Sequence, residues 1–267
     1  METAVFNDFR QLIYDQCGIV LTPEKHGLLL TRIQKRLRIL GLQEPKAYLE
    51  RVRADLSGAE LRELINAIST NTTSFYREPN HFTVLSRILK ARAERQEEIK
   101  IWCAASSSGE EPYTIGFTAE DALRDRAARY KILATDISIT VLERAVAGLY
   151  TDEGVKPIPE PTKNKYLERS ETKDIVWWRV CDELRSHIAF RRFNLIEFPY
   201  PLKGNIDIIF CRNVMIYFDR PTRQKIIDQF TRLLSPGGYL FLSHSENLLG
   251  IEHTFKRFDN SVFIKES

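Results

Sequence analysis

Two adjacent glutamates follow a turn of small residues in the middle of the chain. Glu110 and Glu111 come directly after Ser106–Gly109, and the apolar run 99–105, which has the length of a buried strand, precedes that turn. Glycine and small side chains let a ligand approach the backbone closely. Pro112 suits a first helical turn, so both carboxylates should lie at a helix N-terminus. Because carboxylates repel a pyrophosphate, this position disfavours NAD and ATP and favours a cofactor with a positively charged end.

A third acid follows the next expected strand. Residues 130–134 are apolar, and Asp136 lies at the end of that run. In a βαβ unit, an acid at this place commonly accepts hydrogen bonds from a ribose. S-adenosylmethionine has a ribose, a sulfonium and an ammonium group, so it suits all three carboxylates. Two other interpretations stay open. Glu110 and Glu111 could only complement a helix dipole, and Asp136 could only cap a helix that starts at Ser138.

Composition narrows the class of protein. The 267 residues are 43% hydrophobic and 28% charged, as in ordinary globular proteins, and the net charge of +3 is too small to indicate nucleic-acid binding. The five histidines form no close pair, so we expect no metal site, and the four scattered cysteines are typical of reduced thiols. No leader or membrane-spanning run is evident, so we expect a cytoplasmic protein without membrane insertion.

The first 95 or so residues show helical periodicity and no strand pattern. Start and stop signals include Thr22-Pro23-Glu24 and Gly41, and Ser57 with Glu60 has the spacing of a capping box. This part is therefore predicted to be a small helical bundle. It contains a group of basic residues: Lys25, Arg32, Lys35, Arg36, Arg38, Arg51, Arg53 and Arg62. They could form a solvated face, or they could dock an acidic partner, either a protein surface or nucleic acid.

The rest of the chain alternates between strand and helix patterns. Beyond those already described, we expect strands at 188–193, 206–214 and 239–243, helices at 80–95, 138–148 and 221–234, a turn at 235–238, and a terminal hairpin turning near Asp259. Prolines crowd the long connection 150–187, which also contains the β-rich run 175–180, so we expect an inserted antiparallel subdomain there. The fold class is thus α/β, a doubly wound sheet with one antiparallel strand.

Four blocks of sequence, in the same order along the chain, resemble those of the CheR family. They are NTTSFYRE (71–78), SSGEEPYTIGF (107–117), CRNVMIYFD (211–219) and SPGGYLFLSHSEN (235–247). CheR proteins are S-adenosylmethionine-dependent methyltransferases that modify glutamates on bacterial chemotaxis receptors. The resemblance implies a Rossmann-like class I methyltransferase domain at 79–267, a receptor-docking helical domain at 1–78, and an inserted β-subdomain at about 150–187.

The resemblance also implies an activity, partners and a site. The enzyme would be a protein-glutamate O-methyltransferase that yields glutamyl methyl esters and S-adenosylhomocysteine. Its partner would be the cytoplasmic helical domain of methyl-accepting chemotaxis proteins; we expect a monomer and no nucleic acid. The implied cofactor-binding residues are Asn71, Thr73 and Arg77 over the cofactor, Glu111 with Glu110 at the methionine amino group, Asp136 at the ribose, Asn194 and Leu195 at the adenine, and Arg212 and Asn213 at the methionine part. The implied catalytic residues are Arg77 and Tyr217.

Methylating a carboxylate needs little acid–base help, because a glutamate of pKa about 4.3 is already ionised near neutral pH. The enzyme must supply alignment and desolvation. Arg77 could orient the carboxylate as a two-pronged donor, or it could form an ion pair with Glu78 or Glu111. Tyr217 could donate a hydrogen bond, or it could be a core residue. Arg212 follows a buried strand, where an unpaired charge is costly, so its position favours function.

The chain departs from the family pattern in two places. The turn before Gly109 is poor in glycine, and Arg169–Asp174 replaces the glycine-rich loop that some members use to hold a receptor peptide. We therefore expect recognition through the helical domain, with Arg32, Lys35, Arg36 and Arg53 contributing. Two other classes stay open: a methyltransferase acting on another protein, on RNA or on a small molecule, and a non-catalytic S-adenosylmethionine sensor. No aromatic-interleaved basic groove supports RNA binding.

Overall fold

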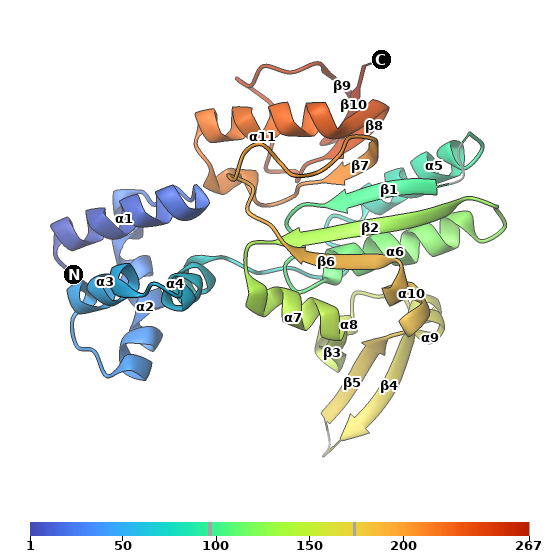
Figure 1. The fold of residues 1–267 in the computed structure, drawn as a ribbon. Coiled ribbons are helices and arrows are strands. Elements are labelled where there is room, and N and C mark those ends of the chain that lie inside the picture. Colours follow the sequence, from blue (N-terminus) through green and yellow to red (C-terminus); the bar gives the residue numbers. More distant parts are fainter. Residues whose placement is uncertain (96–97, 173–174, 267) are drawn as a thin grey trace. The chain divides into compact units, whose positions relative to one another are not determined.

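The computed structural model describes residues 1–95, 98–172 and 175–266. The chain forms two compact units (Figure 1). The helical unit comprises Met1–Thr70 and Tyr217–Thr222, and the sheet unit comprises Asn71–Ile216 and Arg223–Ser267. This division falls between Thr70 and Asn71, whereas the sequence suggested a domain boundary after residue 78. The functional boundary at residue 78 stays a prediction. No helix among the described residues has the length and apolarity needed to cross a bilayer.

The helical unit contains four α-helices and a short 3₁₀ turn at Pro23–Lys25. The helices are α1 (Thr3–Cys17), α2 (His26–Leu40), α3 (Pro45–Ala54) and α4 (Ala59–Ile68). Gly18 and Gly41 end the first two in the left-handed conformation, which glycine adopts without steric cost. Helically spaced apolar residues such as Phe9, Ile33 and Leu64 are fully buried in the core of the unit. The expected helical bundle is confirmed.

The start of α4 differs from the expected capping box. Its N-cap position is Gly58, which makes no side-chain cap. Asp55 supplies the acceptors instead, because its carboxylate accepts from the amide of Glu60 at 2.7 Å and from the amide of Ser57 at 3.0 Å. The capping-box prediction was therefore wrong. Asp55 has the same chemistry as a capping residue and lies close enough to reach the free amides of the first turn.

The sheet unit contains a seven-stranded sheet in the order β6-β2-β1-β7-β8-β10-β9. The bounds are β1 (Glu98–Cys103), β2 (Arg129–Asp136), β6 (Ile188–Arg192), β7 (Ile206–Phe210), β8 (Leu234–Phe241), β9 (Phe255–Asp259) and β10 (Val262–Lys265). In this sheet β10 alone runs opposite to the other six strands, because it is antiparallel to both β8 and β9. The expected doubly wound sheet with one antiparallel strand is confirmed, and the parallel strands bring their carboxyl ends to one edge.

Two sequence-based boundaries need correction. The strand expected over 206–214 ends at Phe210. The turn expected at 235–238 lies inside β8, because Leu234 already pairs with Ile206. The register shifts between Ile206 and Ile208, and Gly237 has a φ of 68°. The proline and glycines thus form a bulge within the strand, a role that their composition does not distinguish from a turn.

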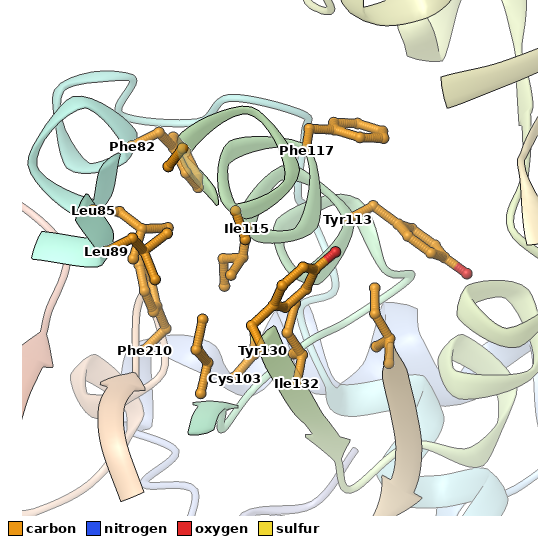
Figure 2. Close-up of a cluster of buried hydrophobic side chains, with 14 of the residues drawn as sticks. Phe82, Leu85, Leu89, Cys103, Tyr113, Ile115, Phe117, Tyr130, Ile132 and Phe210 are labelled. Atoms are coloured by element: carbon orange, nitrogen blue, oxygen red, sulfur yellow. The ribbon is translucent and has the colours of Figure 1, made fainter. Parts of the chain in front are cut away.

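Helices cover both faces of the sheet. They are α5 (Asn80–Arg92), α6 (Glu110–Leu123), α7 (Ile139–Ala147), α10 (Asp182–Ser186) and α11 (Arg220–Leu233). The side chains of β1 alternate between the faces. Trp102 meets Phe230 of α11 at 5.4 Å between ring centroids, whereas Cys103 joins the cluster that α5 and α6 bury on the opposite face (Figure 2).

The inserted subdomain contains α8 (Asp152–Val155), α9 (Glu160–Tyr166) and a three-stranded antiparallel sheet in the order β3-β5-β4. Its strands are β3 (Leu149–Thr151), β4 (Leu167–Thr172) and β5 (Ile175–Val180). Tyr166 stacks on Phe117 of α6 with 5.4 Å between ring centroids, so the subdomain shares the core of the sheet unit. Lys173 and Asp174, part of the stretch compared with the family's glycine-rich loop, lie outside the described residues.

Candidate active site

The turn between β1 and α6 is packed so closely that only glycine fits at its end. Gly109 has a φ of 101°. A Cβ atom there would lie 2.7 Å from the hydroxyl of Tyr150 and 3.0 Å from the Cα of Ala145. The Tyr150 hydroxyl donates to the carbonyl of Ser108 at 2.8 Å and so holds the turn from outside. The first turn of α6 is therefore fixed at the carboxyl edge of the sheet.

The two glutamates of this turn have different partners. Glu110 accepts from the hydroxyl of Ser108 at 2.8 Å. Glu111 accepts from the Cys103 thiol at 3.2 Å and from Nη1 of Arg212 at 2.6 Å. Successive helical residues point about 100° apart, which explains the divergence. Burial raises the pKa of both carboxyl groups, although Arg212 opposes this for Glu111.

Asp136 ties the ends of two strands together. One of its oxygens accepts from the amide of Ser107 at 2.9 Å, and the other accepts from the amide of Ser138 at 3.0 Å. Burial raises the pKa of this carboxyl group. The side chain of Ser138 itself caps α7 by accepting from the amide of Val141. Asp136 therefore organises the turn after β1 at the edge where a ligand would meet the sheet.

Arg212 lies just after β7 and forms ion pairs with two acids, Glu78 and Glu111. Its side chain is fully buried. Nη2 lies 3.0 Å from Glu78 and donates to the carbonyl of Arg77 at 2.6 Å, while Nη1 pairs with Glu111. Nε has no hydrogen-bond partner within the described part of the chain. One buried N–H donor of this guanidinium is thus left without a partner in the described part of the protein.

The segment 71–78 is anchored to the sheet unit by an aromatic side chain. Phe75 is fully buried. Its ring lies 4.8 Å from that of Tyr150 in an edge-on arrangement and 6.1 Å from that of Phe117. Aromatic pairs of this geometry add to the stabilisation from buried area alone. The polar residues of the segment are thereby held beside the start of α6.

Those polar residues meet the same turn. The hydroxyl of Ser107 donates to the carbonyl of Asn71 at 2.9 Å, and Nη1 of Arg77 donates to the carbonyl of Thr72 at 2.9 Å. Thr73 is half-buried in the same segment. Glu78 and Glu111, the two possible ion-pair partners of Arg77, are both paired with Arg212. The guanidinium of Arg77 is therefore held by a backbone carbonyl.

The remaining predicted residues follow β6 and β7. Asn194 and Leu195 are both buried, and the carbonyl of Leu195 accepts from the hydroxyl of Tyr200 at 2.7 Å. Asn213 has a φ of 59°, in the left-handed region. Tyr217 ends a short 3₁₀ turn, η2 (Met215–Tyr217), and belongs to the helical unit. Its role in catalysis stays a prediction.

The donor set of the sheet unit fits S-adenosylmethionine. The half-buried carboxylates of Glu110, Glu111 and Asp136 lie around the turn that starts α6 and favour a positively charged ligand. The unpartnered Nε of Arg212 suits a carboxylate such as that of the methionine part. The acids can accept hydrogen bonds from an ammonium group, and the Nε of Arg212 can donate to a carboxylate, so the set suits a ligand that has both groups.

Comparison with known families agrees with this geometry. The model of the CheR methyltransferase SAM-binding domain matches residues 71–264, and that of the CheR methyltransferase all-alpha domain matches residues 4–69. The chain belongs to the CheR methyltransferase family. Its sheet unit is therefore a class I methyltransferase domain that uses S-adenosylmethionine, as the resemblance implied.

Similar CheR relatives cover nearly the whole chain. The chemotaxis protein methyltransferase of Klebsiella aerogenes is 40% identical over 255 residues, which are 96% of this chain and 87% of the relative. That of Escherichia coli is 38% identical over 263 residues, 98% of this chain and 91% of the relative. The solved structure of an O-methyltransferase family protein from Burkholderia thailandensis is 14% identical, covers 82% of this chain and 51% of that chain, and has a TM-score of 0.38, too low to carry an argument.

Sequence reasoning missed two acids that the CheR fold brings to the site. Glu78 pairs with Arg212, and Glu246 accepts hydrogen bonds from the turn that follows Arg212. Both lie inside the blocks that resemble the family, but the sequence indicated only an ion pair with Arg77 for Glu78 and no role for Glu246. The signal for Glu246 was its spacing from Ser243, because Ser-x-x-Glu is a pattern in which a carboxylate reaches back to a backbone amide.

Glu78 also lies near two histidines that are far apart in the sequence. One ligand atom each from Glu78, His81 and His244 lies within 4.8 Å of the others. The guanidinium of Arg212 already stands 3.0 Å from this carboxylate, and its charge opposes a metal cation. Burial, with Arg212 adding to it, lowers the pKa of His81 to about 4. The expectation of no metal site stays a prediction.

Proposed function

We propose that this CheR protein transfers the methyl group of S-adenosylmethionine to glutamate side chains of chemotaxis receptors, as a protein-glutamate O-methyltransferase. The observation that carries the proposal is the buried Glu111–Arg212 pair with its unpartnered Nε at the start of α6. The names of the relatives, chemotaxis protein methyltransferases, supply the class of substrate. They give no support to RNA or a small molecule as the acceptor.

We assign the binding of the cofactor to residues around the carboxyl edge of the sheet. Glu111, with Glu110 beside it, takes the amino group, and Asp136 takes the ribose. Arg212 and Asn213 take the methionine part, while Asn194 and Leu195 flank the adenine. Asn71, Thr73 and Arg77 cover the cofactor from the segment anchored by Phe75. The burial of the acids supports these assignments, because a desolvated carboxylate attracts a cation more strongly than an exposed one.

The bound cofactor supplies an activated methyl group on a sulfonium. The protein must hold the acceptor carboxylate in line and exclude water. We assign the orientation of that carboxylate to Arg77, whose guanidinium is held by the Thr72 carbonyl and keeps further N–H donors for a second partner. Tyr217 is the second catalytic candidate, through its hydroxyl. No general base is needed, since the acceptor is already ionised near neutral pH.

We further propose that the helical unit docks the receptor through the exposed side of α2. Lys35 and Arg38 are exposed there, and the exposed apolar side chain of Ile39 lies next to them. Three of the residues expected to contribute have partners within the unit: Arg32 donates to the carbonyls that end α4, Arg36 pairs with Glu60, and Arg53 lies 3.7 Å from Asp8. Lys35 and Arg38 are therefore the stronger candidates for meeting an acidic surface.

The direct test is methyl transfer from labelled S-adenosylmethionine to receptor cytoplasmic domains, with peptide mapping of alkali-labile esters. We expect label on glutamates and none on RNA. Arg77→Ala and Tyr217→Phe should each lower the transfer rate, by up to about a hundredfold. Tyr217→Phe should change the cofactor affinity far less, whereas Arg77→Ala should also weaken cofactor binding because we assign Arg77 to both roles. A wild-type protein that binds the cofactor but labels no receptor would reject the proposal in favour of a sensor.

A further inference from the structure

Glu246 lies in the turn that follows β8, next to the turn that follows β7 and contains Arg212 and Asn213. It is buried, with 6% of its surface exposed. One carboxylate oxygen accepts from the amides of Val214 at 2.9 Å and Met215 at 2.7 Å. The other accepts from the amides of Asn213 at 2.9 Å and Ser243 at 2.9 Å. The hydroxyl of Ser243 adds a fifth bond at 2.7 Å.

These bonds join two neighbouring turns at the carboxyl edge of the sheet. β7 and β8 are parallel partners, with Phe210 opposite Phe241. The turn after β7 contains Arg212 and Asn213, and it leads into η2, which ends at Tyr217. The turn after β8 contains Glu246 itself. One carboxylate therefore fixes the backbone that presents Arg212 and Asn213, two of the proposed functional residues.

The bonds also explain an unusual backbone conformation. Asn213 adopts a φ of 59°, which costs energy for a residue with a Cβ. Three consecutive amides, those of Asn213, Val214 and Met215, point at a single carboxylate in this conformation. Bonds from amides to an ionised acceptor are stronger than bonds between neutral groups. Without that acceptor, three N–H donors lose their partner, one of them buried and two part-buried, and the conformation loses its support.

We propose that Glu246 is a positioning residue for methyl transfer: it holds the turn after β7 so that Arg212 and Asn213 can bind the cofactor. This inference rests on the proposed function. It assigns Glu246 no contact with cofactor or acceptor. Its effect is exerted through the backbone of Asn213, which directly follows Arg212.

Glu246→Gln is the decisive substitution, because it preserves size and removes acceptor capacity. An amide has one acceptor oxygen, and its NH2 group would face amides that are themselves donors. We expect the dissociation constant for S-adenosylmethionine to rise at least about tenfold, and hydrogen exchange at the amides of Val214 and Met215 to accelerate. Glu246→Asp keeps the charge but is one methylene shorter, so it should give an intermediate loss in both measurements.

Asp207, near the start of the same strand β7, offers a matched control. It is also 6% exposed, and it accepts from Arg92 at 2.7 Å and from the amide of Lys100 at 2.8 Å. Asp207→Asn should lower the melting temperature, yet it should leave cofactor affinity within about twofold of wild type. The inference fails if Glu246→Gln, or Glu246→Asp should the first variant not fold, binds the cofactor as wild type does. It also fails if Asp207→Asn weakens binding equally. Failure of the wild-type protein to bind the cofactor would instead reject the proposed function.

Discussion

Each unit of the molecule contains an arginine that bridges two glutamates. In the helical unit, Arg36 of α2 contacts Glu60 through Nε at 2.9 Å and Nη2 at 2.7 Å, and it reaches Glu63 through Nη1 at 3.2 Å. In the sheet unit, Arg212 contacts Glu111 and Glu78. The two sites have the same kinds of charged groups. They differ in whether every nitrogen of the guanidinium has a hydrogen-bond partner within the described part of the protein.

All three guanidinium nitrogens of Arg36 donate hydrogen bonds to the two glutamates, and its side chain is 17% exposed. Arg212 is fully buried and leaves Nε without a partner within the described residues. A buried, unsatisfied donor costs about 1–3 kcal/mol, so a fold retains one where something else compensates. The comparison shows that the same kinds of charged groups can close their contacts within one unit and leave a buried donor over in the other. The unpartnered donor alone does not mark a ligand site, because Nε of Arg223 also lacks a partner among the described residues; at Arg212 it lies beside the three acids of the proposed site.

Neutralising the two arginines should separate these roles most strongly. Arg212→Met leaves two buried carboxylates without a counter-charge, so we expect a loss of about 3–5 kcal/mol in the free energy of unfolding and no measurable cofactor binding. Arg36→Met should cost less, about 1–3 kcal/mol, because water reaches its site. Denaturant unfolding and calorimetry with S-adenosylmethionine would measure both quantities.

Arg36→Met should bind the cofactor as wild type does at a temperature where it is folded. If it loses affinity as Arg212→Met does, the two arginines are equivalent and the contrast drawn between them is wrong.

Acidification should affect the acids of the two units in opposite ways. Hydrogen bonding, led by the amide of Glu60, lowers the pKa of Asp55 to about 2. Its contribution to stability is therefore present above the unfolded pKa of about 3.9 and is lost only as the pH falls through about 2. Burial raises the pKa of Glu110, Glu111 and Asp136 above the unfolded values. These three groups reduce stability at neutral pH, and that cost shrinks as the pH falls toward the unfolded values.

As the pH falls, the affinity for S-adenosylmethionine should decrease while the cost of these three acids to stability shrinks. As the pH falls from neutral through the raised pKa values of these acids, we expect the affinity for S-adenosylmethionine to fall, by up to about tenfold per pH unit for each acid that must be ionised. Over that range, the three acids should not lower the melting temperature of the free protein. Calorimetry and thermal unfolding across this range test the sign. An affinity that is flat while the melting temperature drops would contradict it.

Charge reversal on α2 should give the smallest effect. In Lys35→Glu with Arg38→Glu, both changed residues are exposed, so folding should be unaffected. We expect receptor methylation at low salt to slow several-fold, with the difference disappearing at high salt because exposed charges are then screened. Lys100→Glu, at an exposed position on β1, is the matched control and should be neutral. Equal rates for all three proteins at low salt would remove α2 from docking.

Much of the sheet unit could be predicted because its signals are local. The apolar run before Ser106, the small turn and the first-turn glutamates identify β1, Gly109 and α6 from neighbouring residues alone. Asp136 at the end of β2 follows from the same βαβ pattern. Prediction failed where a residue's role depends on a distant partner. Asp55 replaced the expected capping box, and the Pro236-Gly237 segment became a bulge because Leu234 pairs with Ile206.

The sequence by itself determined the family, the alternation of strands and helices, and the positions of the acids that we propose as ligands of the cofactor, because periodicity, turn residues and motif spacing lie along the chain. Only the tertiary structure decided that Arg212 bridges Glu78 and Glu111, and that Glu246 holds the turn after β7. These contacts join residues whose separation in sequence has no fixed relation to their separation in space. They form because parallel strands bring their carboxyl ends, and the turns that follow them, to one edge of a sheet.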